Sequence, residues 1–369
     1  MFFNLFRKNP SVLCIDVGYR NIKIVEVCNK AGAEIHVKKF GLGKTPIGAI
    51  SNGSIIRIDR VVQAIRKIIS QQNIKAKSAK IIMSGTNIIT RIYMVEKIED
   101  EEFDTTVRGT ILYNLPFLAN NYHADYKILE TIVADNKEIS RVFITAVPHL
   151  IIQSYVKVVQ QLGLKPLSID IPGNSTAKFF SKVKDVNKYK DTRVLENTSM
   201  ENNYIIYAVI DFGSETTIIN FLQDGVLNFN KVILCGSSNI DEHISKDVGV
   251  NIEEAERLKI HYGLKVPNDE STEEHRMVYD SINTFVIKIV KQILNCLEFY
   301  QKNLQGLAIS KVFISGGGSK LYGLNLYLQS VLKVPVYPIS TLDLKGVKID
   351  GRIEKENLIF MANSLGISM

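Results

Sequence analysis

The stretch CIDVGYRNIKIVEV, residues 14–27, reads as two strands joined by a tight turn. The first strand runs into Asp16, the chain turns at Gly18, and alternating apolar residues continue to Val27. Glycine permits a positive φ and lets the turn backbone approach an anion without a Cβ in the way. A carboxylate at the tip of a hairpin that is otherwise apolar therefore indicates a binding site rather than core.

The same layout returns in the second half of the chain as YAVIDFGSETTIINFLQDG, residues 207–225. Here Asp211 ends a strand, and Gly213 follows two residues later. The exposed N–H groups of such a turn form a concavity that binds anions. Four side chains after this glycine belong to the predicted site, three of them with hydroxyl groups: Ser214, Glu215, Thr216 and Thr217.

The two aspartates predict a metal ion as well as phosphates. A carboxylate beside a phosphate is repelled unless a cation lies between them, and Mg²⁺ usually keeps several of its waters. We therefore expect Asp16 and Asp211 to face each other and to hold Mg²⁺ through water. Lys23, seven residues after Asp16, is expected to balance phosphate charge.

A third glycine turn, ISGGGS, follows a strand at residues 311–315 and opens a helix. A backbone without side chains can lie flat against a base or ribose, so this turn completes a predicted nucleotide cleft between two halves. The residues of this turn in the predicted site are Gly316, Gly317, Gly318 and Ser319.

The alternative to a shared cleft is two unrelated hairpins, because Asp and Gly are common turn residues. We favour the cleft because each hairpin opens its half of the chain with the same strand–turn–strand order.

The stretch GLGKT, residues 41–45, resembles the end of a P-loop. The full motif needs another glycine at residue 38, which is Lys, and Pro46 follows instead of a helix. We therefore exclude a Walker-type phosphate site here.

The chain has 369 residues, of which 46% are apolar and 22% charged, as in globular proteins large enough for two domains. No apolar run reaches the roughly 18 residues that span a bilayer. The four cysteines show no disulfide or zinc spacing, which favours a reducing, cytoplasmic compartment.

The positive charge gathers in the first part of the chain, where residues 1–100 carry 17 Lys and Arg against 7 Asp and Glu. This basic region suits phosphates, an anionic membrane surface or an acidic partner, or is simply a solvated surface, which we favour. Aromatic residues do not interleave with the basic ones, so we expect no nucleic-acid partner.

The order of strand-like and helical segments predicts several parts. Strand, strand, strand, helix, strand at the start indicates a mixed α/β layer, and residues 88–165 read as a separate α+β unit. The predicted parts are a first core subdomain (1–87 and 166–185, with 345–369 packing back on it), an inserted subdomain (88–165), a polar linker (186–203), a second core subdomain (204–234 and 305–344) and a helical lobe (235–304).

The order of IDVGYRNIK, AVIDFGSETT and ISGGGS resembles the phosphate 1, phosphate 2 and adenosine motifs of the actin-like ATPase superfamily, which contains actin, MreB and FtsA. The resemblance implies an α/β actin-like ATPase fold, with ATP bound in a cleft between two duplicated halves. The segment 88–165 resembles the subdomain that FtsA carries in its first half, so we expect an FtsA-like inserted α+β subdomain.

A narrower resemblance covers essentially the whole chain. The layout FFNLF…IDVG…IKIVEV, then EDEEFDTTVRGTILYNLPF, then RVFITAVPHLIIQSYVKVVQQLGLKPLSIDIP, is similar to PilM-type assembly proteins of type IV pili. AERLKIHYG, residues 255–263, resembles the family's Ala-Glu-x-x-Lys helix. That likeness implies that Glu256 and Lys259 contact the nucleotide.

This resemblance implies a cytoplasmic ATP-binding scaffold at the inner face of the cell membrane, with ATP and Mg²⁺ as cofactors and weak or no hydrolysis. The implied partner is the cytoplasmic N-terminal tail of a PilN-like bitopic membrane protein. The tail would lie in a groove between the inserted subdomain and the first core subdomain. The pilus motor ATPase and a second copy of the chain are further candidate partners. Membrane association would be peripheral, through these partners.

The first turn departs from the family pattern, because Tyr19, Arg20 and Asn21 stand where small hydroxyl residues are usual. The departure removes hydroxyl donors from the phosphate site, although Arg20 can contribute charge, and it leaves nucleotide affinity and hydrolysis open.

Two other functions also stay open. A slow ATPase or phosphotransferase needs a base or a water-positioning group at the γ-phosphate. The candidates for that role are His149, Gln153 and Ser154. The other alternative is a nucleotide-dependent polymerising cytoskeletal protein like FtsA or MreB.

Overall fold

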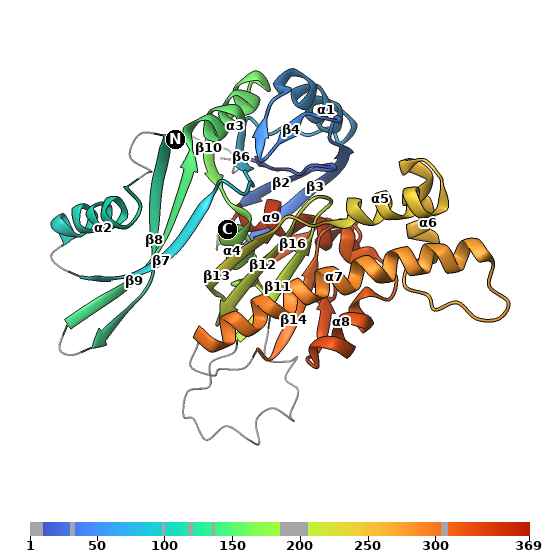
Figure 1. The fold of residues 1–369 in the computed structure, drawn as a ribbon. Coiled ribbons are helices and arrows are strands. Elements are labelled where there is room, and N and C mark those ends of the chain that lie inside the picture. The colour runs from blue at the N-terminus through green and yellow to red at the C-terminus, as the bar shows by residue number, and fades with distance from the viewer. Residues whose placement is uncertain are drawn as a thin grey trace.

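The computed structural model describes residues 10–29, 34–97, 100–116, 121–134, 137–184, 206–303 and 309–369. These residues form two large sheets with helices packed on them, and a smaller three-stranded unit that projects to one side (Figure 1). The predicted polar linker at 186–203 lies outside the described residues.

The first large sheet has six strands in the order β10-β6-β1-β2-β3-β16. β1, β2 and β3 are antiparallel neighbours, whereas β6 runs parallel to β1, β10 to β6 and β16 to β3. The strands are β1 (Val12–Val17), β2 (Asn21–Asn29), β3 (Ile35–Lys44), β6 (Ser78–Ile82), β10 (Lys165–Asp170) and β16 (Val347–Ile349). A short hairpin of β4 (Ile50–Ser51) and β5 (Ser54–Ile55) precedes the first helix.

Two pairs of helices pack on this sheet. α1 (Ile58–Gln71) and α3 (His149–Gln161) contact each other and the sheet. α1 buries the apolar stripe that predicted it, namely Val61, Val62, Ile65 and Ile68. α9 (Leu358–Gly366) contacts both large sheets. α4 (Pro172–Phe180) contacts α9, the second sheet and, through Asp170, the end of β10. α4 and α9 therefore join the two sheets (Figure 1).

The first four residues of the stretch GLGKT end β3, which packs against α1. A Cβ added to Gly41 would lie 2.3 Å from Cγ2 of Ile68, and one on Gly43 would lie 2.8 Å from its Cδ1. Both glycines therefore let helix and strand approach closely. This packing role agrees with the exclusion of a phosphate loop at this position.

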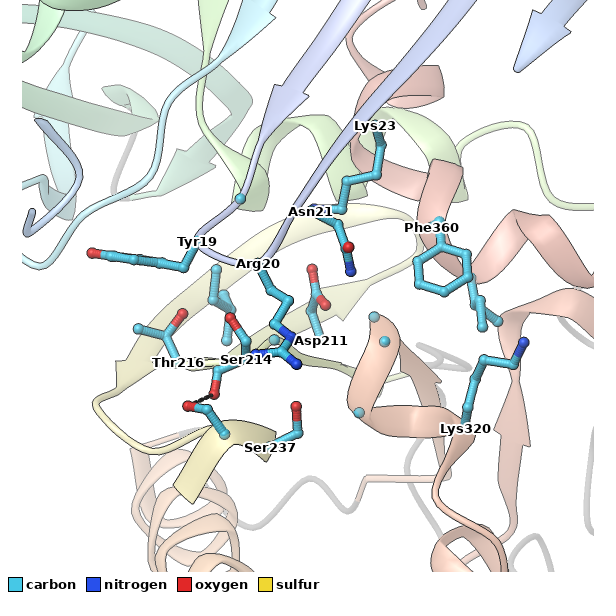
Figure 2. Close-up of a pocket in the computed structure, with 18 of the residues that line it drawn as sticks. Tyr19, Arg20, Asn21, Lys23, Asp211, Ser214, Thr216, Ser237, Lys320 and Phe360 are labelled. Atoms are coloured by element: carbon cyan, nitrogen blue, oxygen red, sulfur yellow. Dashed lines mark hydrogen bonds between the residues drawn. The ribbon is translucent and has the colours of Figure 1, made fainter. Parts of the chain in front are cut away.

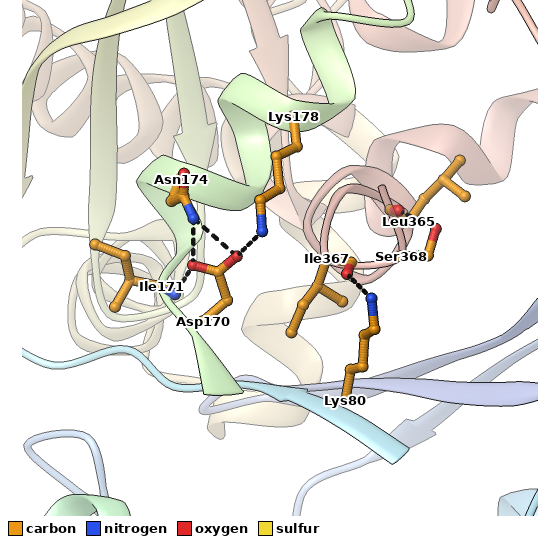
Figure 3. Close-up of polar contacts among 8 residues, drawn as sticks. All are labelled: Lys80, Asp170, Ile171, Asn174, Lys178, Leu365, Ile367 and Ser368. Carbon is orange, nitrogen blue, oxygen red and sulfur yellow. Dashed lines mark hydrogen bonds and ion pairs between the residues drawn. The ribbon is translucent and has the colours of Figure 1, made fainter. Parts of the chain in front are cut away.

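Polar contacts fix the ends of α4 and α9 to the first sheet (Figure 3). Lys80 of β6 donates through Nζ to the carbonyl oxygen of Ile367, just after α9, at 3.0 Å. Asp170, which ends β10, accepts from Asn174 Nδ2 at 2.9 Å and from Lys178 Nζ at 2.8 Å, both on α4. The two helices that join the sheets are thus held at β6 and β10.

The projecting unit is a sheet of order β7-β9-β8, antiparallel throughout, with one helix. Its elements are β7 (Ile89–Glu96), α2 (Asp100–Asn114), β8 (Tyr122–Ala134) and β9 (Lys137–Pro148). Phe103, Val107 and Ile111 of α2 form a small core with Val142 and Ile144 of β9. The expectation of an α+β unit between the early strands and β10 is confirmed, while its predicted residue limits stay a prediction.

The second large sheet has the order β13-β12-β11-β14-β15. Its strands are β11 (Ile206–Phe212), β12 (Thr217–Gln223), β13 (Val226–Ile233), β14 (Lys311–Ser315) and β15 (Val336–Pro338). The helices of this half are α5 (Ser237–Val248), α6 (Ile252–Tyr262), α7 (Glu273–Asn303) and α8 (Leu324–Leu332). The short 3₁₀ turns are η4 (Gly317–Lys320), η5 (Ile339–Thr341) and η6 (Lys355–Asn357).

The two large sheets repeat one topology. In each, three antiparallel strands follow one another (β1-β2-β3 and β11-β12-β13), and two later strands add in parallel beside the first (β6, β10 and β14, β15). β1 and β11 therefore occupy equivalent central positions, and Asp16 and Asp211 lie at equivalent ends of these strands. The prediction of two duplicated halves is confirmed.

Candidate functional site

A cavity of about 390 Å³ lies between the two halves. The β1–β2 turn lines it from the first half, and the β11–β12 turn, the start of α5, α6 and η4 line it from the second. Figure 2 shows labelled side chains of the two aspartate turns, of the start of α5 and of η4 around the open space, with Phe360 of α9 at one side. All three turns that the sequence singled out therefore meet at one cavity.

Twelve of the fifteen predicted site residues line this cavity: Asp16, Gly18, Lys23, Asp211, Gly213, Ser214, Thr216, Glu256, Lys259, Gly316, Gly317 and Gly318. The remaining three do not. Glu215 is exposed, whereas Thr217 is buried and donates through Oγ1 to the carbonyl oxygen of Cys235 at 2.8 Å. Ser319 donates through Oγ to the carbonyl oxygen of Gly316 at 2.7 Å, so its hydroxyl closes η4.

The first turn is braced by hydrogen bonds, one within the turn and one from Thr45 just after β3. The N–H of Gly18 donates to the carbonyl oxygen of Asn21 at 3.1 Å, and Thr45 Oγ1 donates to the carbonyl oxygen of Gly18 at 2.6 Å. Asp16 is buried and accepts from Lys23 Nζ at 3.0 Å. The Lys23 ammonium thus compensates the Asp16 carboxylate, and its predicted role of balancing phosphate charge stays a prediction.

The second turn is anchored by the start of α5. The N–H groups of Ser237 and Ser238 donate to the carbonyl oxygens of Gly213 and Ser214 at 2.9 and 2.8 Å. The first N–H groups of a helix otherwise lack partners, so this contact satisfies them and fixes the turn. The turn's carbonyl groups point to the helix, which leaves its hydroxyl groups at Ser214 and Thr216 on the cavity side.

The ionisation of Asp211 depends on several neighbours in the site. Burial raises the pKa of Asp211, and the neighbouring Asp16 raises it further, while Lys23 and the hydrogen bond from Asn363 lower it. A Cβ on Gly316 would lie only 2.2 Å from Oδ1 of Asp211, and Gly316 has a φ of +81°. Glycine is therefore required where the third turn passes the carboxylate.

The two carboxylates suit a hydrated Mg²⁺. Asp16 and Asp211 line one cavity, and the charge of Asp16 raises the pKa of Asp211. Within the described ranges, no cluster of three or more His, Cys, Asp or Glu is arranged to hold a metal without other ligands. Mg²⁺ commonly binds through one or two carboxylates plus waters and substrate phosphates, so this donor set fits the ion only together with a phosphate ligand.

The far end of the cavity is a network of opposite charges on α5 and α6. Lys259 Nζ lies 2.6 Å from Asp241 Oδ1 and donates to the carbonyl oxygen of Ser237 at 3.1 Å. Burial raises the pKa of Asp241, and the Lys259 ammonium opposes that shift. Glu256 forms an ion pair with Arg20, which comes from the first half.

Several lining residues were not singled out from the sequence. They are Ser84, Pro172, Ile218, Ser237, Ser238, Ile240, Asp241, Ile260, Lys320, Leu321, Ile359, Phe360, Ala362 and Asn363. Lys320 Nζ lies 5.7 Å from the centre of the Phe360 ring, within cation–π range. Asp241 could have been predicted from the sequence, because a carboxylate on an amphipathic helix beside the helix of Lys259 is a natural partner for that lysine.

The residues considered for phosphoryl-transfer chemistry lie elsewhere. His149, Gln153 and Ser154 are absent from the cavity wall. His149 and Gln153 are exposed, and Ser154 Oγ accepts from the N–H of Ile55 at 3.2 Å and donates to the carbonyl oxygen of Ile151 at 2.8 Å. Ser154 therefore links α3 to the β4–β5 hairpin.

Solved structures share this fold. A PilM–PilN type IV pilus biogenesis complex contains a chain that superposes with a TM-score of 0.78 at 21% identity, over 98% of both chains. MreB5 of Spiroplasma citri bound to AMPPNP superposes with a TM-score of 0.53 at 10% identity, over 97% of this chain and 96% of that one. The actin-like ATPase fold predicted from the motifs is confirmed.

The sequence is also similar to FtsA cell division proteins. FtsA of Neisseria meningitidis serogroup B is 25% identical over 280 residues, 68% of this chain, and the chain spans only 61% of the length of that relative. FtsA of Staphylococcus epidermidis is 23% identical over 373 residues, 90% of this chain and 75% of that protein. None of the helices in the described residues is both long and apolar enough to cross a bilayer. The family described as type IV pilus assembly protein PilM matches residues 14–369, and the chain belongs to that family.

Proposed function

We propose that this chain is an ATP-binding scaffold of the inner-membrane assembly platform of a type IV pilus or a related filament or secretion machine. The observation that carries the proposal is the shared cavity. Both aspartate turns and the glycine turn line it, in a chain of the PilM family. An MreB of the same fold binds the nucleotide analogue AMPPNP, which supports a nucleotide as the ligand.

The ligand we propose is ATP with Mg²⁺. The phosphates would lie between the turns that carry Gly18 and Gly213, and the nucleoside near Glu256 and Gly316–Gly318. Asp16 and Asp211 would hold the ion through water. Mg²⁺ would neutralise part of the phosphate charge, which two facing carboxylates would otherwise repel.

The nucleotide would act mainly as a conformational ligand, with weak or no hydrolysis. The carboxylate of Asp16 is bound by Lys23 and that of Asp211 by Asn363, so neither is held ready to take a proton from water. His149, Gln153 and Ser154 lie away from the cavity. A ligand that binds both halves favours the closed cleft only by the difference in its affinity for the two states.

The projecting unit is placed to respond to cleft closure, because it contacts both halves. Arg141 of β9 donates to the side-chain oxygen of Asn228 on β13, in the second half. On the other side, Tyr19 Oη accepts from the N–H of Gly53 at 3.0 Å, and a Cβ on Gly53 would lie 2.1 Å from the Ser84 carbonyl oxygen. The phosphate turn is thus packed, through the β4–β5 hairpin, against the segment that leads into β7.

The partner we propose is the cytoplasmic N-terminal tail of a PilN-like bitopic membrane protein. The solved PilM–PilN complex supports this choice. The tail would lie in the groove between the projecting unit and the first half, because an extended peptide can bind by backbone pairing and a few apolar pockets. The chain would then sit at the inner face of the membrane through its partner, with the pilus motor ATPase as a further partner.

Titration calorimetry tests the nucleotide site. Intact protein should bind ATP in the presence of Mg²⁺ and more weakly without it. Asp211→Ala should abolish the Mg²⁺-dependent part, whereas Asp269→Ala, at an exposed position, should bind like the intact protein. A synthetic PilN tail peptide should bind with different affinity to ATP-loaded and empty protein. Absence of ATP binding would overturn the proposal.

Two results would favour the other functions. Nucleotide-dependent filaments in electron micrographs would favour an FtsA-like or MreB-like polymer. Steady-state ATP turnover above about one per second would favour an enzyme.

A further inference from the structure

One ion pair of the cavity connects the two halves directly. Arg20, in the β1–β2 turn, pairs with Glu256 on α6, and both side chains line the cavity. They keep 31% and 28% of their side-chain surface exposed, so solvent and ligands can reach them. Figure 2 shows Arg20 reaching from its turn into the cavity, toward the turn that carries Asp211 and Ser214.

The other ion pairs of the cavity stay within one half. Lys23 pairs with Asp16 in the first half, and Lys259 pairs with Asp241 in the second. Among the described residues that line the cavity, Arg20–Glu256 is thus the ion pair that crosses from one half to the other. It forms a direct charged contact, which we call the clasp, between the two halves.

The same ion pair hinders the binding of an anionic ligand. A phosphate that enters between the two turns meets an attractive guanidinium and, next to it, the repulsive carboxylate of Glu256. Arginine binds phosphate oxygens through two parallel N–H groups, and such charge-assisted bonds are stronger than ordinary ones. A partly exposed ion pair, by contrast, contributes little stability. Exchange of the carboxylate for a phosphate is therefore favourable.

We propose that Arg20 exchanges partners when the cleft loads, leaving Glu256 and binding the phosphates of the ligand. This inference rests on the proposed nucleotide site. It assigns a binding role to a residue of the turn that lacks the usual hydroxyl groups. In the empty protein Arg20–Glu256 links the two halves across the cleft, and in the loaded protein the bond from Arg20 to the phosphate takes over that link.

The exchange predicts opposite effects for the two members of the pair. Arg20→Ala removes the side chain that would bind the phosphates, so the affinity for phosphates should fall. Glu256→Gln removes the competing charge while keeping the size of the side chain, so affinity for phosphates should rise. In a protein that already lacks Arg20, the Glu256→Gln change should have no further effect.

The test is titration calorimetry with inorganic tripolyphosphate and Mg²⁺, a probe that has phosphates but no nucleoside. Glu256→Gln should bind it about threefold more tightly than the intact protein does. Arg20→Ala should bind it about tenfold more weakly, and Arg20→Ala with Glu256→Gln should match Arg20→Ala alone. Glu253→Gln changes the same charge at an exposed position of α6 and controls for the general loss of negative charge.

Each outcome is decisive. Tighter binding by Glu256→Gln that disappears in the double variant supports the exchange, as does binding that first becomes measurable in Glu256→Gln. Unchanged or weaker tripolyphosphate binding by Glu256→Gln, in a protein whose intact form binds ATP, overturns the exchange and leaves the nucleotide site standing. Absence of both ATP and tripolyphosphate binding in all variants overturns the nucleotide site, and the exchange with it.

Discussion

Asn363 on the C-terminal helix α9 donates a hydrogen bond to Asp211 on the central strand β11, with 3.2 Å between Nδ2 and Oδ2. The amide oxygen of Asn363 in turn accepts from Thr176 Oγ1 on α4 at 3.1 Å. The orientation of the Asp211 carboxylate in the cavity is thus set by both helices that join the two sheets.

Replacing Asn363 by Ala should weaken Mg²⁺-dependent ATP binding by about tenfold or more, because a hydrogen bond to a charged group contributes about 1.5–3 kcal/mol. Loss of the donor leaves the Asp211 carboxylate without its amide partner and raises its pKa further. Thr176→Val removes only the hydrogen bond that supports Asn363. It should therefore weaken Mg²⁺-dependent ATP binding less, by about twofold. Calorimetry with Mg²⁺ and ATP measures both, and intact affinity in Asn363→Ala would show that the bond is dispensable.

The motifs of the turns could be predicted from the sequence because each is local. Alternating apolar residues around Asp-x-Gly fix a strand, a turn and a strand within about fifteen residues, and the two copies appear as β1–β2 and β11–β12. The glycine turn that opens η4 follows from the same local reasoning. Repetition of the local pattern also implied the duplicated halves.

The direction of individual side chains could not be read in the same way. β12 begins at Thr217, and successive side chains of a strand point to opposite faces, so Thr216 faces the cavity whereas Thr217 faces the core. A shift of one residue in the start of the strand would reverse these roles. Hydroxyl groups at adjacent positions were therefore predicted together, although only one of the two lines the cavity.

Asn363 and Phe360 could not have been predicted because they reach the site through tertiary packing alone. α9 lies at the end of the chain and returns to the first sheet, where Lys80 holds its C-terminal end. Nothing in the apolar stretch LIFMANSLG shows that one of its polar side chains faces a carboxylate more than a hundred residues earlier.

Gly316 should tolerate no side chain. A Cβ there would lie 2.2 Å from Oδ1 of Asp211, and the φ of +81° is costly for any other residue. Gly316→Ala should therefore lower the free energy of unfolding by about 1–3 kcal/mol, measured by urea denaturation. The control is Gly351→Ala, since a Cβ at Gly351 has no atom within 4 Å and should leave stability nearly unchanged. Equal stability of the two variants would contradict the packing of the third turn on Asp211.

The stability of the empty protein should depend on the ionisation of Asp211. Burial and the nearby Asp16 raise the pKa of Asp211 above its unfolded value, although Lys23 and Asn363 oppose the shift. A group whose pKa is raised on folding stabilises the fold below its unfolded pKa, and that contribution is lost as the pH rises through the folded pKa. At neutral pH the ionised carboxylate of Asp211 therefore lowers the stability of the folded protein.

Asp211→Asn removes that cost, so the empty variant should melt at a higher temperature than the intact protein at neutral pH. The gap should narrow as the pH falls from neutral toward the unfolded pKa of an aspartate, about 4, because the intact carboxyl group takes up its proton. Thermal melts of both proteins without nucleotide measure this difference. A gap that stays constant over this range would mean that Asp211 is not the group responsible.

The contact between Arg141 and Asn228 should couple ATP binding in the cleft to peptide binding at the projecting unit. Arg141→Ala removes the bond from β9 to β13 but leaves every residue of the cavity wall in place, so ATP affinity should change by less than about twofold. The affinity of the PilN tail peptide should then no longer differ between ATP-loaded and empty protein. Arg91→Ala, an exposed arginine of the same three-stranded sheet, should keep the difference. A nucleotide effect on peptide binding that persists in Arg141→Ala would place the coupling on the other route, through Tyr19 and the β4–β5 hairpin.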